Sequence, residues 1–387
     1  MKILMALESD FPPDIRVENE IEALSEAGHE VHVACYSHDK HFDIPAGLHY
    51  KIHKKYITRL RYKSSVGALK LDYYFRFWSK FLGNILASQS FDAIHIHDLP
   101  LAKVGYEIHK KHGMKFVLDL HENWPALLSI STHTRTLMGR ILCSVPQWER
   151  YELKYAQRAD RVIVVVDEAR DRLVAKGIPR EKIEVVSNTL NTRLFSFPGQ
   201  EKDPSHVTLV YGGGVNYHRG LQYVIRALPA LKKQIPVIRF WIVGSGNYLE
   251  HLKKLAEELD VQSLITFWGW KSQKELLEII SRGDYAVIPH IRSPHTDATI
   301  PHKIFQYMYA GIPIVSSDCL PLKRILGETG TGVCFEDRNP DSIASVIINL
   351  HRDRAFLEKI PQNGRRWVEE KYNWDHESET LLKVYSS

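Results

Sequence analysis

The sequence predicts an α/β protein with two domains, each built around a parallel β-sheet. Its 387 residues exceed what one ordinary hydrophobic core accommodates. Short apolar strands alternate with helical segments, which is the pattern of parallel strands joined by crossover helices. Residues 196–205 lose all periodicity and precede a new strand, so a linker is expected there. The expected domains cover residues 1–195 and 206–365, followed by a helical segment over residues 366–387.

The first domain opens with a strand, a loop, a helix and a second strand. The strands are Lys2–Leu7 and Glu30–Cys35, and between them a helix over about Arg16–Ala27 ends at Gly28. This order begins a Rossmann-like sheet. The first loop lacks the Gly-x-Gly-x-x-Gly fingerprint, which argues against a dinucleotide cofactor.

Polar residues follow later strands of the first domain. The strand Phe91–His97 leads into Asp98, and Lys115–Leu120 is followed by His121 and Glu122. Side chains just past the carboxyl ends of parallel strands line the crevice where ligands bind, so His121 and Glu122 are candidate site residues. The alternative for His121 is a structural, hydrogen-bonded histidine. The remaining elements expected here are helix Arg140–Gln157, strand Arg161–Val166, helix Glu168–Lys176 and strand Ile183–Ser187.

The second domain begins again with a strand, Val207–Tyr211, and three glycines. Gly213 and Gly214 let the backbone approach a ligand, and Arg219 before the next helix can bind phosphate oxygens. A glycine run alone is a weak signal. The other expected elements are strands Arg239–Val243, Leu264–Trp268, Tyr285–Pro289, Ile314–Ser316 and Val333–Glu336, a helix over Pro340–Arg352 and a final amphipathic helix with Trp367, Tyr372 and Trp374.

The loop-to-helix junction after Tyr285–Pro289 has the chemistry of an anion site. Pro301 suits the first turn of a helix and Thr299 is a competent cap, which predicts a helix opening near Ile300. Free backbone N–H groups at that end, the helix dipole and the Lys303 ammonium all favour a phosphate. The alternative is an ordinary α/β crossover with an exposed polar loop.

Composition is that of a soluble globular protein, with 44% hydrophobic and 25% charged residues and a net charge of +5. No apolar run long enough to span a membrane and no signal peptide are recognised, so a cytoplasmic location is expected. Cys35, Cys143, Cys319 and Cys334 lie far apart, which indicates buried thiols instead of a zinc site or disulfide framework.

Basic and aromatic residues interleave over residues 50–81, where Asp72 is the only acidic residue. Such a segment suits a helix on an anionic membrane face or a surface for a polyanionic acceptor. The alternative is a surface helix with inward aromatic side chains and solvated Lys and Arg. A third alternative is nucleic-acid binding, but no recognised nucleic-acid-binding module in the sequence supports it.

The junction resembles the donor-binding motif of family 4 retaining glycosyltransferases. The matching residues are Pro301-His-Lys303-Ile-Phe-Gln306-Tyr307 and then Ala310-Gly-Ile-Pro313. The family has two glutamates eight positions apart, which are replaced here by Gln306 and Ala298. The Gln306 carbonyl still accepts hydrogen bonds from ribose, but without charge assistance. Asp297 is the expected substitute ligand for a sugar hydroxyl.

The resemblance extends from about Pro12 to Trp374 and implies the GT-B architecture, two Rossmann-like domains facing across a cleft. The last helix would cross back to the first domain. Asp14 and Arg16 match an Asp-x-Arg-Val signature, which implies acceptor or phosphate contact. The alternative is an N-cap aspartate and an exposed first-turn arginine. His121 and Glu122 match an Asp-x-His-Glu motif whose histidine lies against the donor sugar.

The resemblance also implies a site for the donor diphosphate on Arg219, Lys303, the Gly213-Gly214 backbone and the helix end near Thr299. A second arginine of the family is replaced by Gly214. Trp270 stands where the family contacts the nucleobase, and it is a candidate for stacking on the base, although a tryptophan at a strand end more often packs inside.

The function implied is retaining transfer of a sugar from a nucleoside-diphosphate sugar, such as a UDP-sugar, to a hydroxyl of a glycan or lipid-linked acceptor in cell-surface polysaccharide assembly. No Asp-x-Asp metal motif is present, so no metal and no other cofactor is expected. Arg219 and Lys303 would stabilise the leaving diphosphate, and His121 the cationic sugar. Two rivals stay open, a non-catalytic sugar-nucleotide-binding or partner subunit and a GT-B nucleotide-sugar epimerase.

Overall fold

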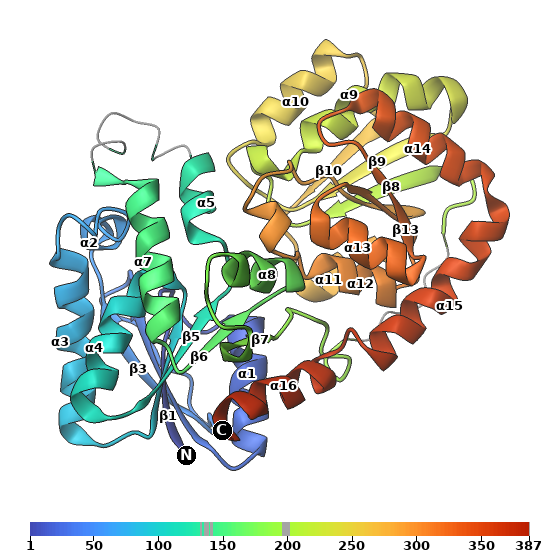
Figure 1. The fold of residues 1–387 in the computed structure, drawn as a ribbon. Helices are drawn as coiled ribbons and strands as arrows, with labels where there is room; N and C mark the ends of the chain where they lie inside the picture. The colour runs from blue at the N-terminus through green and yellow to red at the C-terminus, as the bar shows by residue number, and fades with distance from the viewer. Residues whose placement is uncertain (132–133, 135–138, 140–141, 196–201, 387) are drawn as a thin grey trace. The chain divides into compact units, whose positions relative to one another are not determined.

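The computed structural model describes residues 1–131, 134, 139, 142–195 and 202–386. The chain divides into two compact units, one formed by residues 1–187 with 377–387 and the other by residues 188–376. Each is an α/β unit around its own parallel sheet (Figure 1).

The unit boundary lies earlier than the sequence predicts. Residues 188–195 group with the second unit, where the Leu190 carbonyl accepts a hydrogen bond from the Trp374 N–H at 2.9 Å. The Phe195 ring lies 5.8 Å from the His302 ring in the same unit. Most of the predicted linker, residues 196–201, lies outside the described residues.

The first unit contains a seven-stranded parallel sheet in the order β3-β2-β1-β4-β5-β6-β7. The strands are β1 (Lys2–Ala6), β2 (Glu30–Ser37), β3 (Lys51–Tyr56), β4 (Ala93–His97), β5 (Lys115–Leu120), β6 (Arg161–Val164) and β7 (Ile183–Val185). In register, Ile3 of β1 pairs with Val31 and Ala93 on its two sides. The central strands are buried on both faces, as parallel sheets require.

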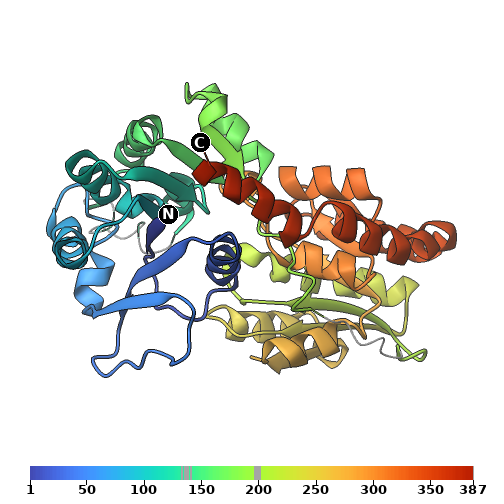
Figure 2. The ribbon, with the colours of Figure 1, turned by 90° about the horizontal axis from the view of Figure 1, so that it is seen from below.

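Helices cover both faces of this sheet. They are α1 (Ile15–Glu26), α2 (Arg59–Lys63), α3 (Tyr73–Ser88), α4 (Ala102–His112), α5 (Trp124–Ile130), α7 (Val145–Arg158), α8 (Asp167–Ala175) and α16 (Trp374–Ser386). Figure 1 and Figure 2 show α1 on the opposite face from α3 and α4. This is what right-handed crossovers produce when the chain runs outward from β1 in both directions.

The second unit contains a six-stranded parallel sheet in the order β10-β9-β8-β11-β12-β13. The strands are β8 (Val207–Gly212), β9 (Ile238–Val243), β10 (Ile265–Gly269), β11 (Tyr285–Ile288), β12 (Ile314–Ser317) and β13 (Gly332–Phe335). The helices are α9 (Leu221–Gln234), α10 (Leu249–Glu258), α11 (Gln273–Ile280), α12 (Lys303–Tyr309), α13 (Leu320–Thr329), α14 (Pro340–Arg352) and α15 (Arg354–Glu370). Both sheets confirm the Rossmann-like α/β prediction.

Three expected elements differ. Lys51–Tyr56 is the edge strand β3, although residues 50–81 were expected to be helical, because pairing with β2 satisfies its backbone. The final helical segment is two helices, α15 and α16, separated at Lys371. The charged helix begins at Val145 instead of Arg140, with Pro146 in its first turn; Arg140 lies outside the described residues.

Among the described residues, no helix has the length and apolar character that a membrane span needs.

Candidate functional site

Arg219 is placed by a tight approach between two segments of the second unit. It ends a 3-10 turn, Tyr217–Arg219, directly before α9. Gly220 has a φ of 73°, and a Cβ there would lie 1.7 Å from the Pro289 carbonyl oxygen. Only glycine permits this contact. It brings Arg219 to the end of β11, where its Nη1 donates to His290 Nε2 at 3.0 Å.

Lys303 reaches the same place from α12. Its Nζ lies 4.0 Å from the centroid of the Tyr211 ring, a cation–π contact at the end of β8. Gly213 has a φ of 135°, which favours glycine, and a Cβ there would lie 2.7 Å from that Nζ, so the glycine leaves room for the amino group. Burial, and then the Arg219 charge, hold the pKa of Lys303 well below its usual value.

The structure therefore brings Arg219 and Lys303 together, as an anion site requires. Burial lowers the pKa of His290 well below its usual value, and Arg219 and Lys303 lower it further. Burial and Arg219 also lower the pKa of His295 and of His218 to about 4. After burial, the Arg219 charge is the cause that all three shifts share. An anion would be strongly favoured among these side chains.

Gly213 plays a different part from the one expected of the glycine backbone. The Gly213 N–H donates to the Val243 carbonyl at 2.9 Å. The Gly214 carbonyl accepts a hydrogen bond from the Tyr211 hydroxyl at 2.7 Å. Because these groups hold the turn in place, Gly213 contributes space for Lys303 and not a free N–H for a phosphate.

Thr299 does not start a helix, so this prediction is wrong. The helix α12 begins at Lys303, three residues later than predicted, and spans seven residues. Thr299 Oγ1 donates to the His295 carbonyl at 3.1 Å and does not cap α12. The segment folds instead around a 3-10 turn over Thr296–Ala298. Side chains, and not a long helix dipole, must therefore supply most of the positive potential.

The remaining donor-side candidates are Asp297, Gln306 and Trp270, which differ in their contacts and exposure. Asp297 accepts from Arg292 Nε at 3.1 and 3.2 Å and from the Leu320 N–H at 2.9 Å, so it has a structural role at the start of α13. Gln306 lies on α12 and is only 8% exposed. Trp270, just after β10, is 74% exposed. Its ring is not packed inside the protein, which keeps it available to a ligand.

On the first unit, Asp14 is the N-cap of α1, accepting from the backbone N–H groups of Arg16 and Val17. Arg16 is 7% exposed, so it is not the surface residue of the alternative reading. Its Nη2 donates to both Asp119 carboxylate oxygens at 2.9 and 3.0 Å, and its Nε to Glu20 Oε1 at 3.0 Å. Arg16 thus holds a buried carboxylate pair. Glu122 is exposed, and its acceptor-side role stays a prediction.

His121 is tied to the same network. Its Nε2 lies 2.9 Å from Asp119 Oδ2 and 3.2 Å from His97 Nδ1. Burial and Arg16 lower the pKa of His121, but Asp119 and Asp98 outweigh them and raise it to about 9. The imidazole is therefore a cation at neutral pH. The stabilisation of a cationic sugar by His121 stays a prediction; a protonated imidazole is a hydrogen-bond donor at both ring nitrogens.

Four buried side chains of this network could offer ligand atoms to a metal. These are Glu20, His95, His97 and Asp119, whose ligand atoms lie within 4.8 Å of one another. Glu20 Oε2 is 4.0 Å from Nε2 of both histidines. Tetrahedral zinc would hold such atoms about 3.4 Å apart. A metal would therefore have to contract the cluster, and Arg16 already occupies Asp119. Glu20 Oε2 and the Nε2 atoms of both histidines are buried without a hydrogen-bond partner, so the cluster neither matches the geometry of bound zinc nor satisfies these atoms by hydrogen bonds.

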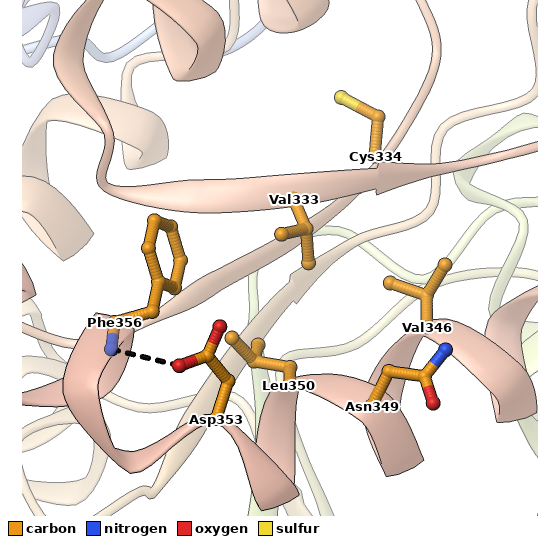
Figure 3. A pocket seen from close by; sticks show the side chains of 7 residues that line it. All are labelled: Val333, Cys334, Val346, Asn349, Leu350, Asp353 and Phe356. Atoms are coloured by element: carbon orange, nitrogen blue, oxygen red, sulfur yellow. Dashed lines mark hydrogen bonds between the residues drawn. The ribbon is translucent and has the colours of Figure 1, made fainter.

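The second unit also contains a hollow of about 440 Å³ between β13 and the helices α14 and α15 (Figure 3). It is lined by Val333, Cys334, Val346, Asn349, Leu350, Asp353 and Phe356. The Asp353 carboxylate accepts from the Phe356 N–H at 3.0 Å. Burial raises the pKa of Cys334 to about 12, which makes the thiol a poor nucleophile. None of the predicted site residues lines this hollow.

Sequence reasoning did not single out the histidines around Arg219, or Asp119 as the centre of its network. A signal existed for the first group, because His290 and His295 stand in the segment that leads directly into the donor motif at Pro301. Nothing in the spacing showed that His218, next to Arg219, would join them. Tertiary packing alone decides that.

Comparisons with known proteins match most of the chain. A family model described as Glycosyltransferase Family 4 matches residues 15–194, and one described as Glycosyl transferases group 1 matches residues 193–367. An uncharacterized glycosyltransferase of Methanocaldococcus jannaschii is 25% identical over 335 residues, which are 81% of each chain. The amylovoran biosynthesis glycosyltransferase AmsK of Erwinia amylovora is 22% identical over 203 residues, 52% of this chain and 50% of that protein.

Solved structures share the fold. Sucrose-phosphate synthase from Thermosynechococcus elongatus superimposes with a TM-score of 0.80 at 17% identity, covering 100% of this chain and 98% of that one. Anabaena HepE, solved in complex with UDP-glucose, gives a TM-score of 0.73 at 15% identity, covering 100% and 99%.

Proposed function

The chain is a glycosyltransferase of the GT-B type, and from that premise we propose that it transfers a sugar, with retention of configuration, from a nucleoside-diphosphate sugar to a hydroxyl of a glycan or lipid-linked acceptor. The observation that carries the proposal is the meeting of Arg219 and Lys303 beside His290 in the second unit. They form a cationic site with the charge that a diphosphate needs.

The chemistry follows from charge. When the bond between the sugar and the diphosphate breaks, negative charge develops on the leaving phosphate. Fixed cations stabilise that charge more in the transition state than in the ground state, which accelerates the reaction. Arg219 and Lys303 supply two positive groups without a metal, so we propose metal-independent transfer. Attack by the acceptor hydroxyl from the side of the leaving phosphate would retain the sugar configuration.

A uridine nucleotide is the first donor to test, because Anabaena HepE was solved in complex with UDP-glucose. Trp270, 74% exposed, is the proposed stacking partner of the base. Buried Gln306 is the proposed ligand of the ribose hydroxyls. His121 is the residue of the first unit that we propose to act on the sugar, as a charged hydrogen-bond donor to a hydroxyl or phosphate oxygen.

The acceptor is proposed to be lipid-linked or presented at a membrane surface, in polysaccharide assembly. Among the matched relatives, the Erwinia amylovora protein is named for the biosynthesis of amylovoran. In this chain, exposed Leu60, Leu71 and Tyr73 lie among basic residues of the 50–81 segment. Apolar and basic side chains together favour an anionic membrane.

The decisive experiment compares Arg219→Ala with Arg226→Ala, an exposed arginine on the adjacent helix α9. Losing one donor to a developing oxyanion costs about 3–4 kcal/mol, so transfer by Arg219→Ala should fall at least about 100-fold. Arg226→Ala should keep wild-type activity. Full activity of Arg219→Ala, with unfolding unchanged, would refute the site.

The same assay separates the rival activities. Wild-type protein is incubated with UDP-sugars with and without acceptor, and the products are identified by NMR. Slow release of free sugar from the donor alone supports a transferase. A new nucleotide sugar without acceptor would identify an epimerase, and tight binding without reaction a non-catalytic subunit.

A further inference from the structure

The contact between Arg219 and His290 is unusual because both side chains are basic. Arg219 Nη1 lies 3.0 Å from His290 Nε2. A guanidinium has only donor N–H groups, so Nε2 must accept and carry no proton. His290 is 4% exposed, and water cannot readily replace either partner. In this arrangement the imidazole is neutral and is the hydrogen-bond acceptor of Arg219 in the anion-free site.

The neighbourhood is rich in unused donors. Arg219 Nε and His295 Nδ1 are buried without a hydrogen-bond partner. The charged and titratable groups that face His290 are Arg219 and Lys303, with His218 and His295 beside them. Its backbone carbonyl accepts from the Ser317 hydroxyl at 2.7 Å, which fixes the residue in place. An anion bound beside Arg219 would give its Nε a partner.

We propose that anion binding at Arg219 and Lys303 is coupled to the uptake of one proton by His290. The anion attracts the Arg219 guanidinium and draws it away from His290 Nε2. The vacated nitrogen then takes a proton from solvent, and the imidazolium becomes a third cation of the site. No bond other than this N–H is formed or broken. The coupling rests on the proposed function only in taking the donor diphosphate as the natural anion.

The direction of the coupling follows from electrostatics. In the anion-free site, burial lowers the pKa of His290, and Arg219 and Lys303 lower it further. A bound anion cancels the two positive charges, so the pKa of His290 rises. At a pH between the pKa of His290 in the free site and its pKa in the anion-bound site, binding takes up a proton. The affinity for the anion must therefore increase as the pH falls. One linked proton corresponds to about tenfold in affinity per pH unit.

The test uses inorganic sulfate, a divalent anion that does not itself titrate near neutral pH. Sulfate binding is measured by calorimetry at about pH 6.5, in two buffers of different ionisation enthalpy. The difference between the observed enthalpies gives the number of protons taken up. Wild type should take up close to one proton and bind sulfate more tightly at about pH 6 than at about pH 8.

His290→Asn isolates the coupling. The asparagine oxygen can still accept from Arg219, but the amide cannot take a proton. Sulfate should still bind, with about one proton fewer taken up than by wild type and a flatter pH dependence. The matched control is His351→Asn, whose histidine lies 3.0 Å from the Tyr285 hydroxyl at the other end of β11. This variant should keep the proton uptake of the wild type.

The inference is overturned if wild type binds sulfate without proton uptake, if His290→Asn keeps the uptake, or if sulfate does not bind at any pH. The proposed function fails separately. Absence of sugar transfer from every nucleotide sugar, with proton-coupled sulfate binding intact, would remove the transferase and leave the coupled anion site.

Discussion

At the scale of single residues, the charge of His121 is the feature with the clearest thermodynamic consequence. Asp119 and Asp98 outweigh burial and Arg16, and they raise the pKa of His121 from 6.5 to about 9. A raised pKa stabilises the fold most below the unfolded value, and that stability is lost as the pH rises through the folded value. His121 should therefore stabilise the protein at about pH 6.5 and cease to do so above about pH 9.

The prediction is tested with His121→Asn in urea unfolding at about pH 6.5 and about pH 9.5. The difference in free energy of unfolding between wild type and variant should be roughly 2–3 kcal/mol larger at the lower pH than at the higher pH. Glu8, whose pKa burial raises to about 8, titrates in both proteins, so the difference between them isolates His121. A gap that is constant across pH would show that His121 is neutral in the folded state.

Trp270 carries a second prediction at this scale. Its ring is 74% exposed, so removing it costs little packing. Base stacking on an aromatic side chain contributes about 1–3 kcal/mol. Trp270→Ala should raise KM for the donor about 5–150-fold with the free energy of unfolding nearly unchanged, whereas Trp270→Phe should recover most of the affinity. Wild-type KM in Trp270→Ala would exclude the stacking role.

Among the helices, α3 shows which part of the basic, aromatic segment 50–81 packs inside the protein instead of facing outward. Tyr74, Phe75, Phe77, Trp78 and Phe81 are buried, so the inward-packing alternative holds for this helix. The apolar residues left outside flank it. Leu60 is 80% exposed on α2, and Leu71 is 54% exposed before α3. A membrane contact would therefore use α2 and the turn before α3, and not the hydrophobic face of α3.

The double variant Leu60→Glu with Leu71→Glu tests that contact by co-sedimentation with vesicles containing phosphatidylserine. Each leucine loses about 1.5–3 kcal/mol of burial in the membrane, so binding should fall at least about tenfold. Leu194→Glu, an exposed leucine of the second unit, is the control and should bind like wild type. Wild-type sedimentation that is insensitive to salt and lipid charge would contradict a contact with the anionic surface.

At the scale of the whole molecule, the fold class could be predicted because apolar strands and glycine-terminated helices are local signals. The helix Pro340–Arg352 was predicted with its observed bounds, since Asn339 is a strong cap followed by proline. What could not be predicted depends on distant packing. Thr299 reads as a cap locally, but its hydroxyl bonds to His295 and α12 starts later. Arg16 reads as exposed, but Asp119, 103 residues away, buries it.

The last prediction concerns residues 377–387, which group with the first unit although they follow the second in the chain. Leu381, Val384 and Tyr385 are buried, and the Tyr385 hydroxyl lies 2.6 Å from His95 Nδ1 beside the Asp119 network. Burial of a large apolar side chain contributes about 1.5–3 kcal/mol. Deleting these residues should therefore destabilise the first unit by several kcal/mol.

The measurement is hydrogen exchange followed by mass spectrometry. Peptides from β1, β4 and β5 should lose protection in the deletion variant, whereas those from β8 and β11 should keep it, because the second unit retains its own core. Tyr385→Phe separates the hydrogen bond from the packing and should cost only about 1 kcal/mol. Equal loss of protection in both sheets would mean that the two units unfold as one, and that the last helix stabilises the molecule as a whole.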